Sequence, residues 1–351
     1  MIGYFLLTIM TVTTRPSTQP LTYGSDINGV VCAYWFDGTG ANQPIEADQL
    51  NERLRAENLK QGFVWLHMDL NVSHAESWLK QHLSLEDEFF DSLHQGLSST
   101  KIDQADQQLL AVMNDVRYDF NFDPSEISTL WLVADQHFMV TGRRTHLSSI
   151  DRLRRAVKRN DPFESSTDLL THLLQDQAEV LANIIRKVTR QVDEIEDAIL
   201  SSHLGQHRAK LGQLRRVMVR LARLLAPEPA ALFRLLQHPP AWITPDQING
   251  LRESTEEFSV ALADMSSLQE RIKLLQEEIA AQIAEANNNS IFILTIVSVL
   301  ALPINLTAGL MGMNVGGVPW ANNPHGFGIV VFLVLSATAF AAWLIYRKLK
   351  N

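Results

Sequence analysis

The apolar residues of this 351-residue chain change their spacing along its length, and each change predicts a different structure. Residues 23–165 alternate short runs rich in β-branched and aromatic residues with amphipathic stretches. From residue 167 onward, apolar residues recur at steps of three and four, as in helices. Residues 290–311 and 327–346 contain no charged residue and are long enough to cross a bilayer. The pattern predicts an α/β domain, then long α-helices, then two C-terminal transmembrane helices.

Within the α/β domain, strands are predicted at residues 29–36, 62–70, 107–120 and 127–143, the last divided into two by a turn near Asp135. Helices are predicted at residues 73–82 and 148–160. Ser73 and Glu76 have the spacing of a capping box at the start of the first helix.

The region 166–289 is predicted to be a cytoplasmic helical stalk. Pro227 and Pro229 interrupt its second helix, and a third helix begins near Thr244–Pro245–Asp246 with no stop before Gly309. An apolar stripe runs along this third helix: Phe258, Leu262, Met265, Leu268, Ile272, Leu275, Ile279 and Ile283.

Composition excludes several classes of protein. A net charge of -9 argues against a general nucleic-acid binder. The single cysteine, Cys32, excludes a disulfide framework and a cysteine metal cluster. No phosphate-binding loop, dinucleotide fingerprint or nucleophile triad is present, so no enzyme is expected. Residues 1–22 read as a disordered tail, and whether translation starts at Met1 or Met10 stays open.

The loop between the two spans, residues 312–326, contains no Lys or Arg, whereas Arg347, Lys348 and Lys350 lie in the basic tail 347–351. The positive-inside rule therefore places the C-terminus in the cytoplasm. Two spans place the N-terminal domain there as well, with membrane lipid around the spans.

The first span carries polar residues that a lipid-facing helix does not need. At heptad spacing they share one face with small and apolar residues: Asn288, Ile291, Thr295, Ser298, Leu302, Asn305, Gly309 and Gly312. In an oligomer this face would line a pore, with Leu302 and Ile291 as constrictions that gate by dewetting. The alternative is helix–helix contact in a dimer. Pro303 predicts a kink.

Gly312-Met313-Asn314, after the first of two C-terminal spans, resembles the signature of the CorA family of divalent metal ion transporters. The α/β domain, the long helix entering the membrane and the basic tail match that family. The resemblance implies a homopentamer in which five first spans line the pore and the long helices form a cytoplasmic funnel.

The loop sequence VGGVPWANNPHG lacks Asp and Glu, and GMNVGGVP is similar to the ZntB zinc-transporter branch. That resemblance implies zinc as the transported ion, crossing the bacterial inner membrane by uptake coupled to protons, with no permanently bound cofactor. The direction of flux, the proton stoichiometry and the selectivity among Zn, Cd, Ni, Co and Mg stay open. The alternatives are a passive Mg, Co or Ni channel of the same fold and a non-conducting membrane-anchored sensor or scaffold.

Each motif residue has an expected role. Gly312 suits a left-handed position after the helix end. Asn314 offers an amide oxygen at the pore mouth, where weak binding permits release, and Met313 packs the loop. His325 is the one good zinc ligand in the loop, and it either attracts ions or lies at an exposed turn.

Four acidic or histidine groups outside the spans have two interpretations each. Glu277 and Glu270 extend the polar face downward and either concentrate cations in the funnel or form a solvated face. The resemblance to the CorA family implies that the acidic residues of 86–91 bind regulatory ions between subunits, and the alternative is a solvated acidic helix. His203 and His207 have the spacing of two metal ligands on one helix face, whereas Gly205 between them favours a helix end.

Overall fold

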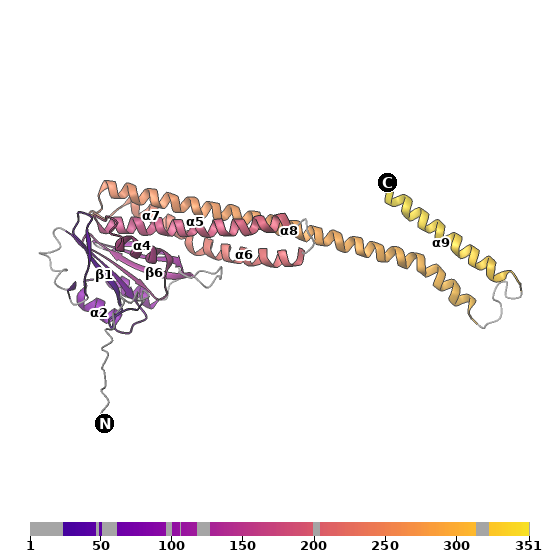
Figure 1. Ribbon diagram of the computed structural model, residues 1–351, viewed down its shortest axis with the longest axis horizontal. Coiled ribbons are helices and arrows are strands. Elements are labelled where there is room, and N and C mark those ends of the chain that lie inside the picture. The colour runs from indigo at the N-terminus through magenta and orange to yellow at the C-terminus, as the bar shows by residue number, and fades with distance from the viewer. Residues whose placement is uncertain are drawn as a thin grey trace, which may run out of the picture. The chain divides into compact units, whose positions relative to one another are not determined.

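The computed structural model describes residues 24–46, 49–50, 62–95, 100–105, 107–117, 127–198, 204–313 and 323–350 (Figure 1). The chain divides into two compact units. The first comprises Met1–Ala198 and Ala209–Lys273, and the second comprises Ile199–Arg208 and Leu274–Asn351. The predicted tail 1–22 lies outside the described residues.

The described part of the first unit contains a seven-stranded sheet in the order β2-β1-β3-β7-β6-β5-β4. Its strands are β1 (Val30–Phe36), β2 (Asn42–Pro44), β3 (Phe63–Asp69), β4 (Lys101–Ala105), β5 (Gln108–Val116), β6 (Ile127–Ala134) and β7 (Phe138–Arg143). β3 and β7 pair in parallel, and the other pairs are antiparallel.

The turn between β6 and β7 forms where the sequence predicts it. The Oδ1 atom of Asp135 accepts hydrogen bonds from the backbone N–H groups of His137 at 2.7 Å and Phe138 at 2.9 Å. Short acidic side chains commonly hold a turn in this way.

Alternate residues of the central strands enter two different cores. On β3, Phe63 and Trp65 belong to one core, and Val64, Leu66 and Met68 belong to the other. Helices α4 (Ser148–Lys158), α5 (Ser166–Ala198) and α7 (Pro227–Gln237) contribute to the first core. Helices α2 (Ala75–His82) and α3 (Asp87–His94) contribute to the second. The predicted mixed α/β domain is confirmed.

The capping box predicted at the start of α2 is wrong. The N-cap residue is His74, without a side-chain capping bond, and Ser73 contacts the His74 ring at 3.3 Å instead. The Glu76 carboxylate is drawn away from the helix start by Lys80 at 2.7 Å and His94 at 3.1 Å. A box of this kind forms instead at α8, where Thr244 N donates to Gln247 Oε1 at 2.9 Å and Gln247 N donates to Thr244 Oγ1 at 3.4 Å.

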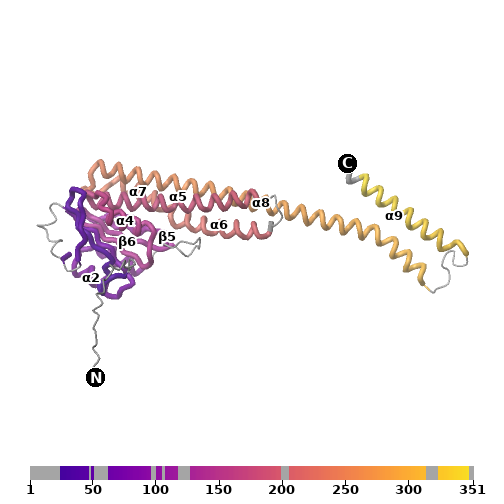
Figure 2. The backbone as a smooth tube through the Cα atoms, viewed as in Figure 1, coloured from indigo at the N-terminus to yellow at the C-terminus, as the bar shows by residue number. Residues whose placement is uncertain are grey.

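Long helices follow the sheet, as predicted: α5, α6 (Leu204–Leu225) and α8 (Pro245–Met311), with the shorter α7 between the last two. Pro227 is the first residue of α7, so the proline starts a new helix rather than only ending the previous one. In the first unit α5 and α8 lie side by side (Figures 1 and 2), where Arg271 of α8 contacts Asp193 at 2.7 Å and also Glu196.

The predicted apolar stripe of α8 is largely buried. Phe258, Met265, Leu268, Ile272, Leu275 and Ile279 are buried, whereas Leu262 and Ile283 are only half-buried. The helix is one continuous element of 67 residues, so the predicted boundary between stalk and first span, 289/290, falls inside it.

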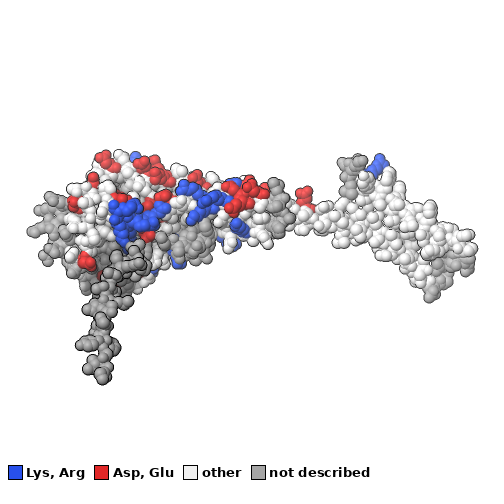
Figure 3. Space-filling model, viewed as in Figure 1, with Lys and Arg blue, Asp and Glu red and all other residues white. Residues whose placement is uncertain are grey.

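Two described helices, α8 and α9 (Gly326–Lys350), are apolar enough over a sufficient length to cross a membrane. Their apolar windows are not buried inside the chain. On the face shown in Figure 3, the outer part of α8 and most of α9 carry no charge. Helix α9 continues through most of the predicted basic tail, as far as Lys350.

Candidate ion pathway

The polar face of the outer part of α8 is exposed along its whole described length. Asn288, Thr295, Ser298 and Asn305 are exposed, and so are the apolar members of the face, Ile291 at 62% and Leu302 at 68%. No other described part of the chain covers them. A face of this composition needs either water or another copy of the helix as its partner.

The hydroxyl groups on this face have fixed orientations. Thr295 Oγ1 donates to the carbonyl of Ile291 at 2.8 Å, and Ser298 Oγ donates to the carbonyl of Leu294 at 2.9 Å. Because each hydroxyl proton is directed at the backbone one turn earlier, the remaining lone pairs are available as acceptors. The two hydroxyls therefore present oxygen acceptors, which suit water or a hydrated cation.

The side chain of Asn305 makes no hydrogen bond with any other described residue, so its amide oxygen and nitrogen are both available. Two residues before it, Pro303 lies inside α8 without ending the helix, and its carbonyl accepts a bond from Thr307 Oγ1 at 2.8 Å. Leu302 precedes Pro303 and Ile291 lies eleven positions before Leu302, so two apolar residues flank the hydroxyl pair. Whether they form constrictions stays a prediction.

The left-handed conformation predicted for Gly312 is wrong. In the described residues positive φ angles occur at Asn160, Gly29, Gly38 and Gly40, and not at Gly312. The reason is that its N–H still donates to the carbonyl of Ala308 at 3.0 Å, which continues the helical pattern for one more residue. Met313 follows with 50% of its surface exposed. Asn314 lies outside the described residues, as does most of the loop.

His325 lies immediately before α9. Its backbone N–H donates to Asn323 Oδ1 at 2.9 Å, and its carbonyl accepts from Ile329 N at 3.1 Å. The imidazole is exposed and makes no hydrogen bond or ion pair with another described residue. Backbone hydrogen bonds therefore fix His325 at the start of α9, and its imidazole ring is available to bind an ion.

The acidic candidates of α8 differ from each other. Glu270 forms an ion pair with Lys273 at 3.0 Å on the same helix, which offsets its charge. Glu277 is exposed and has no ion pair among the described residues. His203 lies outside the described residues, and the described part of the chain contains no group of three or more His, Cys, Asp or Glu side chains arranged to hold a metal.

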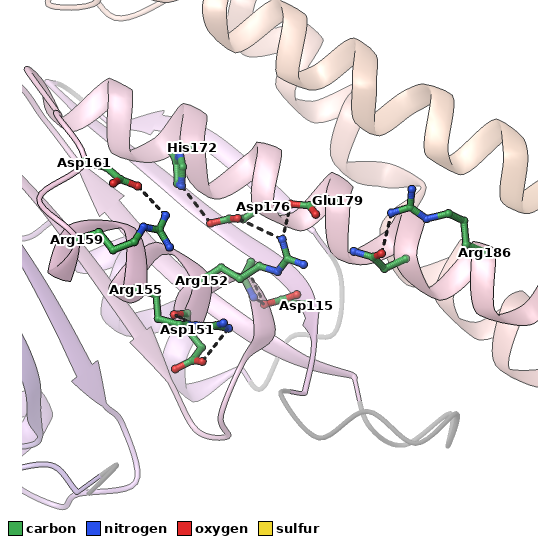
Figure 4. A network of polar contacts seen from close by, with 12 residues as sticks. Asp115, Asp151, Arg152, Arg155, Arg159, Asp161, His172, Asp176, Glu179 and Arg186 are labelled. Atoms are coloured by element: carbon green, nitrogen blue, oxygen red, sulfur yellow. Dashed lines mark hydrogen bonds and ion pairs between the residues drawn. The ribbon is translucent and has the colours of Figure 1, made fainter. Parts of the chain in front are cut away.

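Sequence reasoning missed a polar network between β5, α4 and α5 in the sheet domain (Figure 4). Arg152 of α4 contacts both Glu179 and Asp176 of α5, the latter at 3.8 Å. Burial raises the pKa of Asp176 to about 7. Asp115 of β5 accepts hydrogen bonds from the N–H of Ser149 at 3.1 Å and from its hydroxyl, yet burial raises the pKa of Asp115 to about 6.

A third buried acid, Glu228, bonds to the part of β5 that β4 does not reach. Its carboxylate accepts hydrogen bonds from Asn114 N at 2.7 Å and Gln177 Nε2 at 2.9 Å, and burial raises its pKa well above the usual range. The local sequence provides no clear signal for these acids, because Asp115 follows Asn114, Asp176 lies between two glutamines and Glu228 lies between two prolines. The network has a structural role here, because it joins the sheet to three helices, α4, α5 and α7.

Comparison with known proteins identifies the family. A family model described as CorA-like Mg2+ transporter protein matches residues 60–348. The divalent cation transporter CmaX of Pseudomonas aeruginosa is 26% identical over 329 residues, which cover 93% of this chain and 97% of the relative. The zinc transport protein ZntB of Pectobacterium atrosepticum is 22% identical over 322 residues, which cover 92% and 96%.

Solved structures share the fold. The full-length CmaX structure matches with a TM-score of 0.78 and 24% identity over 93% of this chain and 99% of that one. The CorA magnesium transporter of Methanocaldococcus jannaschii matches with a TM-score of 0.74 and 18% identity over 90% and 97%. The family match over most of the chain, the sheet domain and the two apolar helices lead to one conclusion: the chain belongs to the CorA-like family of transporters, and it is a transporter rather than an enzyme.

Proposed function

We propose that several copies of this chain assemble with the polar face of α8 inward and conduct divalent cations, with zinc as the transported ion. One observation carries the proposal. The outer part of α8 has no charged residue, yet it presents two hydroxyls and an amide on one exposed face that no described part of the chain covers. A simple anchor has no use for such groups in a bilayer.

The chemistry of this face suits conduction better than storage. Residues 290–346 contain no Asp, Glu, Lys or Arg, so the path offers neutral oxygens. Neutral oxygens hold a hydrated divalent ion weakly enough for release. Asn314 would supply a further amide oxygen at the outer mouth, beyond the end of α8, and His325 at the start of α9 would meet ions there.

Zinc is favoured by the absence of acidic residues in the loop 312–326 and by relatives that are zinc transport proteins. We further propose uptake across the bacterial inner membrane driven by a proton gradient, by a homopentamer with both termini in the cytoplasm. The basic residues Arg347, Lys348 and Lys350 at the end of the sequence of α9 support that orientation.

A broader divalent-cation channel is the second candidate. It is favoured by the relative named a divalent cation transporter and by the magnesium named in the family description. The two candidates differ in competition, because a magnesium channel would be inhibited by excess Mg2+ and a zinc carrier would not.

The test is zinc flux into proteoliposomes that contain a zinc-sensitive dye, with and without an inward proton gradient and with Mg2+ as competitor. Asn314→Ala is expected to reduce flux at least tenfold, on the order of 1.4 kcal/mol. Asn322→Ala, which removes the same amide elsewhere in the loop, is the matched control. Near-normal flux in Asn314→Ala would contradict a role for Asn314 in the pathway. A complete absence of divalent-ion flux in the wild-type protein would overturn the transport proposal.

A further inference from the structure

Helix α6 presents an unusual surface because all its charged residues are positive. Among its 22 residues, six are Lys or Arg and none is Asp or Glu: Arg208, Lys210, Arg215, Arg216, Arg220 and Arg223. One face of the helix is buried in the chain, through Leu211, Leu214, Val217, Met218, Leu221 and Leu225. The opposite face of α6 is exposed and is therefore available to bind a partner.

That opposite face contains a defined strip, which we call the basic stripe: Arg216, Val219, Arg220 and Arg223. The four residues occupy positions i, i+3, i+4 and i+7, so they share one side of the helix. All four are exposed, and Val219 exposes 47% of its surface. None of the three arginines has an ion pair with another described residue. The stripe is an exposed apolar residue surrounded by unpaired cations.

The first half of α8 carries the complementary arrangement, which we call the acidic stripe: Glu253, Glu256, Glu257, Val260 and Asp264. These residues follow the same three-and-four spacing and are all exposed, Val260 at 61%. None of the four acids has an ion pair among the described residues. Both stripes belong to the first compact unit.

We propose that the basic stripe of one copy docks on the acidic stripe of a second copy, with Val219 packed against Val260. This inference rests on the proposed function, since it names the contact by which the conducting oligomer assembles. The stripes extend about 10 Å and about 16 Å along their helices, so the basic stripe fits within the length of the acidic stripe. An apolar centre with a charged rim is the usual composition of an interface between proteins.

A second copy explains the observations better than an anionic lipid surface. A lipid surface would account for the arginines, but it would leave the acidic stripe and Val260 unpartnered and would repel the four acids. The two stripes also differ from each other, so the contact joins unlike surfaces. Such a head-to-tail contact propagates from copy to copy and closes into a ring when the rotation permits.

The test is a disulfide cross-link in the full-length protein, in a Cys32→Ser background so that no native thiol takes part. Val219→Cys combined with Val260→Cys is expected to give a ladder of covalent oligomers on mild oxidation. Each single variant gives no ladder. A link within one chain is out of reach, because Gln269 donates to the carbonyl of Met218 at 3.0 Å and Val260 lies nine residues, about 13 Å, before Gln269 on α8. That separation exceeds the roughly 7 Å limit for Cα atoms.

Charge reversal makes the test specific. In the double-cysteine protein, Arg216→Glu with Arg220→Glu is expected to lower the cross-linking rate at least about tenfold at low salt, and less in high salt. Adding Glu256→Arg and Glu257→Arg restores most of the rate. Lys187→Glu, an exposed cation of α5 outside the stripe, is the control and leaves the rate within about twofold.

The outcomes separate this inference from the proposed function. A protein that conducts zinc but gives no ladder overturns the interface alone. A ladder with no ion flux supports the interface and counts against transport. Cross-linking that is insensitive to reversal overturns the electrostatic match. Loss of binding to phosphatidylglycerol vesicles on Arg216→Glu and Arg220→Glu, with no ladder in the double-cysteine protein, assigns the basic stripe to lipid and overturns the proposal.

Discussion

Replacing Glu228 by Ala and by Gln distinguishes how the hydrogen bonds of a buried carboxyl group and how its charge affect the stability of the fold. Glu228 is the second residue of α7 and is fully buried. It accepts hydrogen bonds from Asn114 N at 2.7 Å and from Gln177 Nε2 at 2.9 Å. The pairing of β4 with β5 ends at Lys101 and Val112, so β4 does not reach Asn114, and the Asn114 N–H donates to Glu228 instead. Glu228→Ala therefore removes both acceptors at once.

The expected destabilisation follows from the polar groups that Glu228→Ala leaves without a partner and from the cavity that it creates. A buried N–H without a partner costs about 1–3 kcal/mol. Gln177 Nε2 keeps its hydrogen bond to the carbonyl of Asn114 at 2.6 Å, so the loss of its bond to Glu228 costs an energy at the lower end of that range. The lost methylene adds about 0.8 kcal/mol, and the cavity adds a similar amount. We expect Glu228→Ala to lower the free energy of unfolding by about 3–5 kcal/mol, a large share of a typical 5–15 kcal/mol.

Glu228→Gln is the informative companion. Burial raises the pKa of Glu228 well above the ordinary 4.5, so the folded protein retains the proton after the unfolded chain has lost it. The stabilisation by Glu228 is complete below about pH 4.5 and declines by about 1.4 kcal/mol per pH unit above it, until the folded carboxyl ionises. Glutamine resembles the neutral acid in shape and does not titrate. The stability of Glu228→Gln relative to wild type should therefore rise with pH.

The assay is thermal unfolding followed by tryptophan fluorescence at pH 5.5 and pH 8.0. At about 2–4 °C per kcal/mol, Glu228→Ala should lower the melting temperature by about 6–20 °C. Glu88→Ala is a matched control, because Glu88 is the second residue of α3 but is exposed. A melting temperature for Glu228→Ala within 2 °C of wild type would refute the reasoning, as would a glutamine variant whose difference from wild type is independent of pH.

Three further expectations follow. Asn305→Leu should reduce zinc flux in proteoliposomes at least about tenfold, whereas Ser336→Leu on α9 should not; equal effects would exclude a pore role for Asn305. Leu302→Ser should raise flux severalfold because it wets an apolar constriction, and unchanged flux would exclude that gate. Burial raises the pKa of Asp176 to about 7, so the stability contributed by its neutral form is lost as pH rises from about 4 through 7. Between pH 4 and pH 8, the free energy of unfolding of Asp176→Asn, measured with denaturant, should therefore rise by about 2–4 kcal/mol relative to that of wild type. Parallel pH profiles of the two proteins would contradict this.

The sequence predicted the elements that local patterns determine. The turn at Asp135 depends on residues two and three positions away. The buried stripe of α8 depends on a spacing within one helix, and it holds for Phe258 and Met265 but weakens at Ile283, which is only half-buried. Such features need no knowledge of distant residues. The failed capping box at Ser73 shows the limit of this approach, because Glu76 is taken by His94, which belongs to another helix.

The features that the sequence did not reveal are contacts between distant segments. Glu228 and Asn114 are 114 positions apart, and nothing near either residue identifies the other. The parallel pairing of β3 with β7 likewise joins the start of the sheet domain to its end. The candidate pathway was recognisable earlier because its residues share one helix face. Under the proposed function its partner would be another copy of the chain, so neither the sequence nor one folded chain would supply the enclosing surface.

Selectivity is harder to infer than the pathway, for a reason that lies in the ligands. Hydroxyl and amide oxygens have no thiolate or imidazole character, so the face of α8 has no group that prefers zinc over other divalent ions. Mg2+ gives up its water reluctantly, whereas Zn2+ accepts fewer ligands more readily. Discrimination along neutral oxygens would then depend on how much water each ion must lose at Leu302 and Ile291. Widening those two positions should therefore reduce the preference for zinc over magnesium, whereas removing Asn305 should reduce the flux of both ions alike.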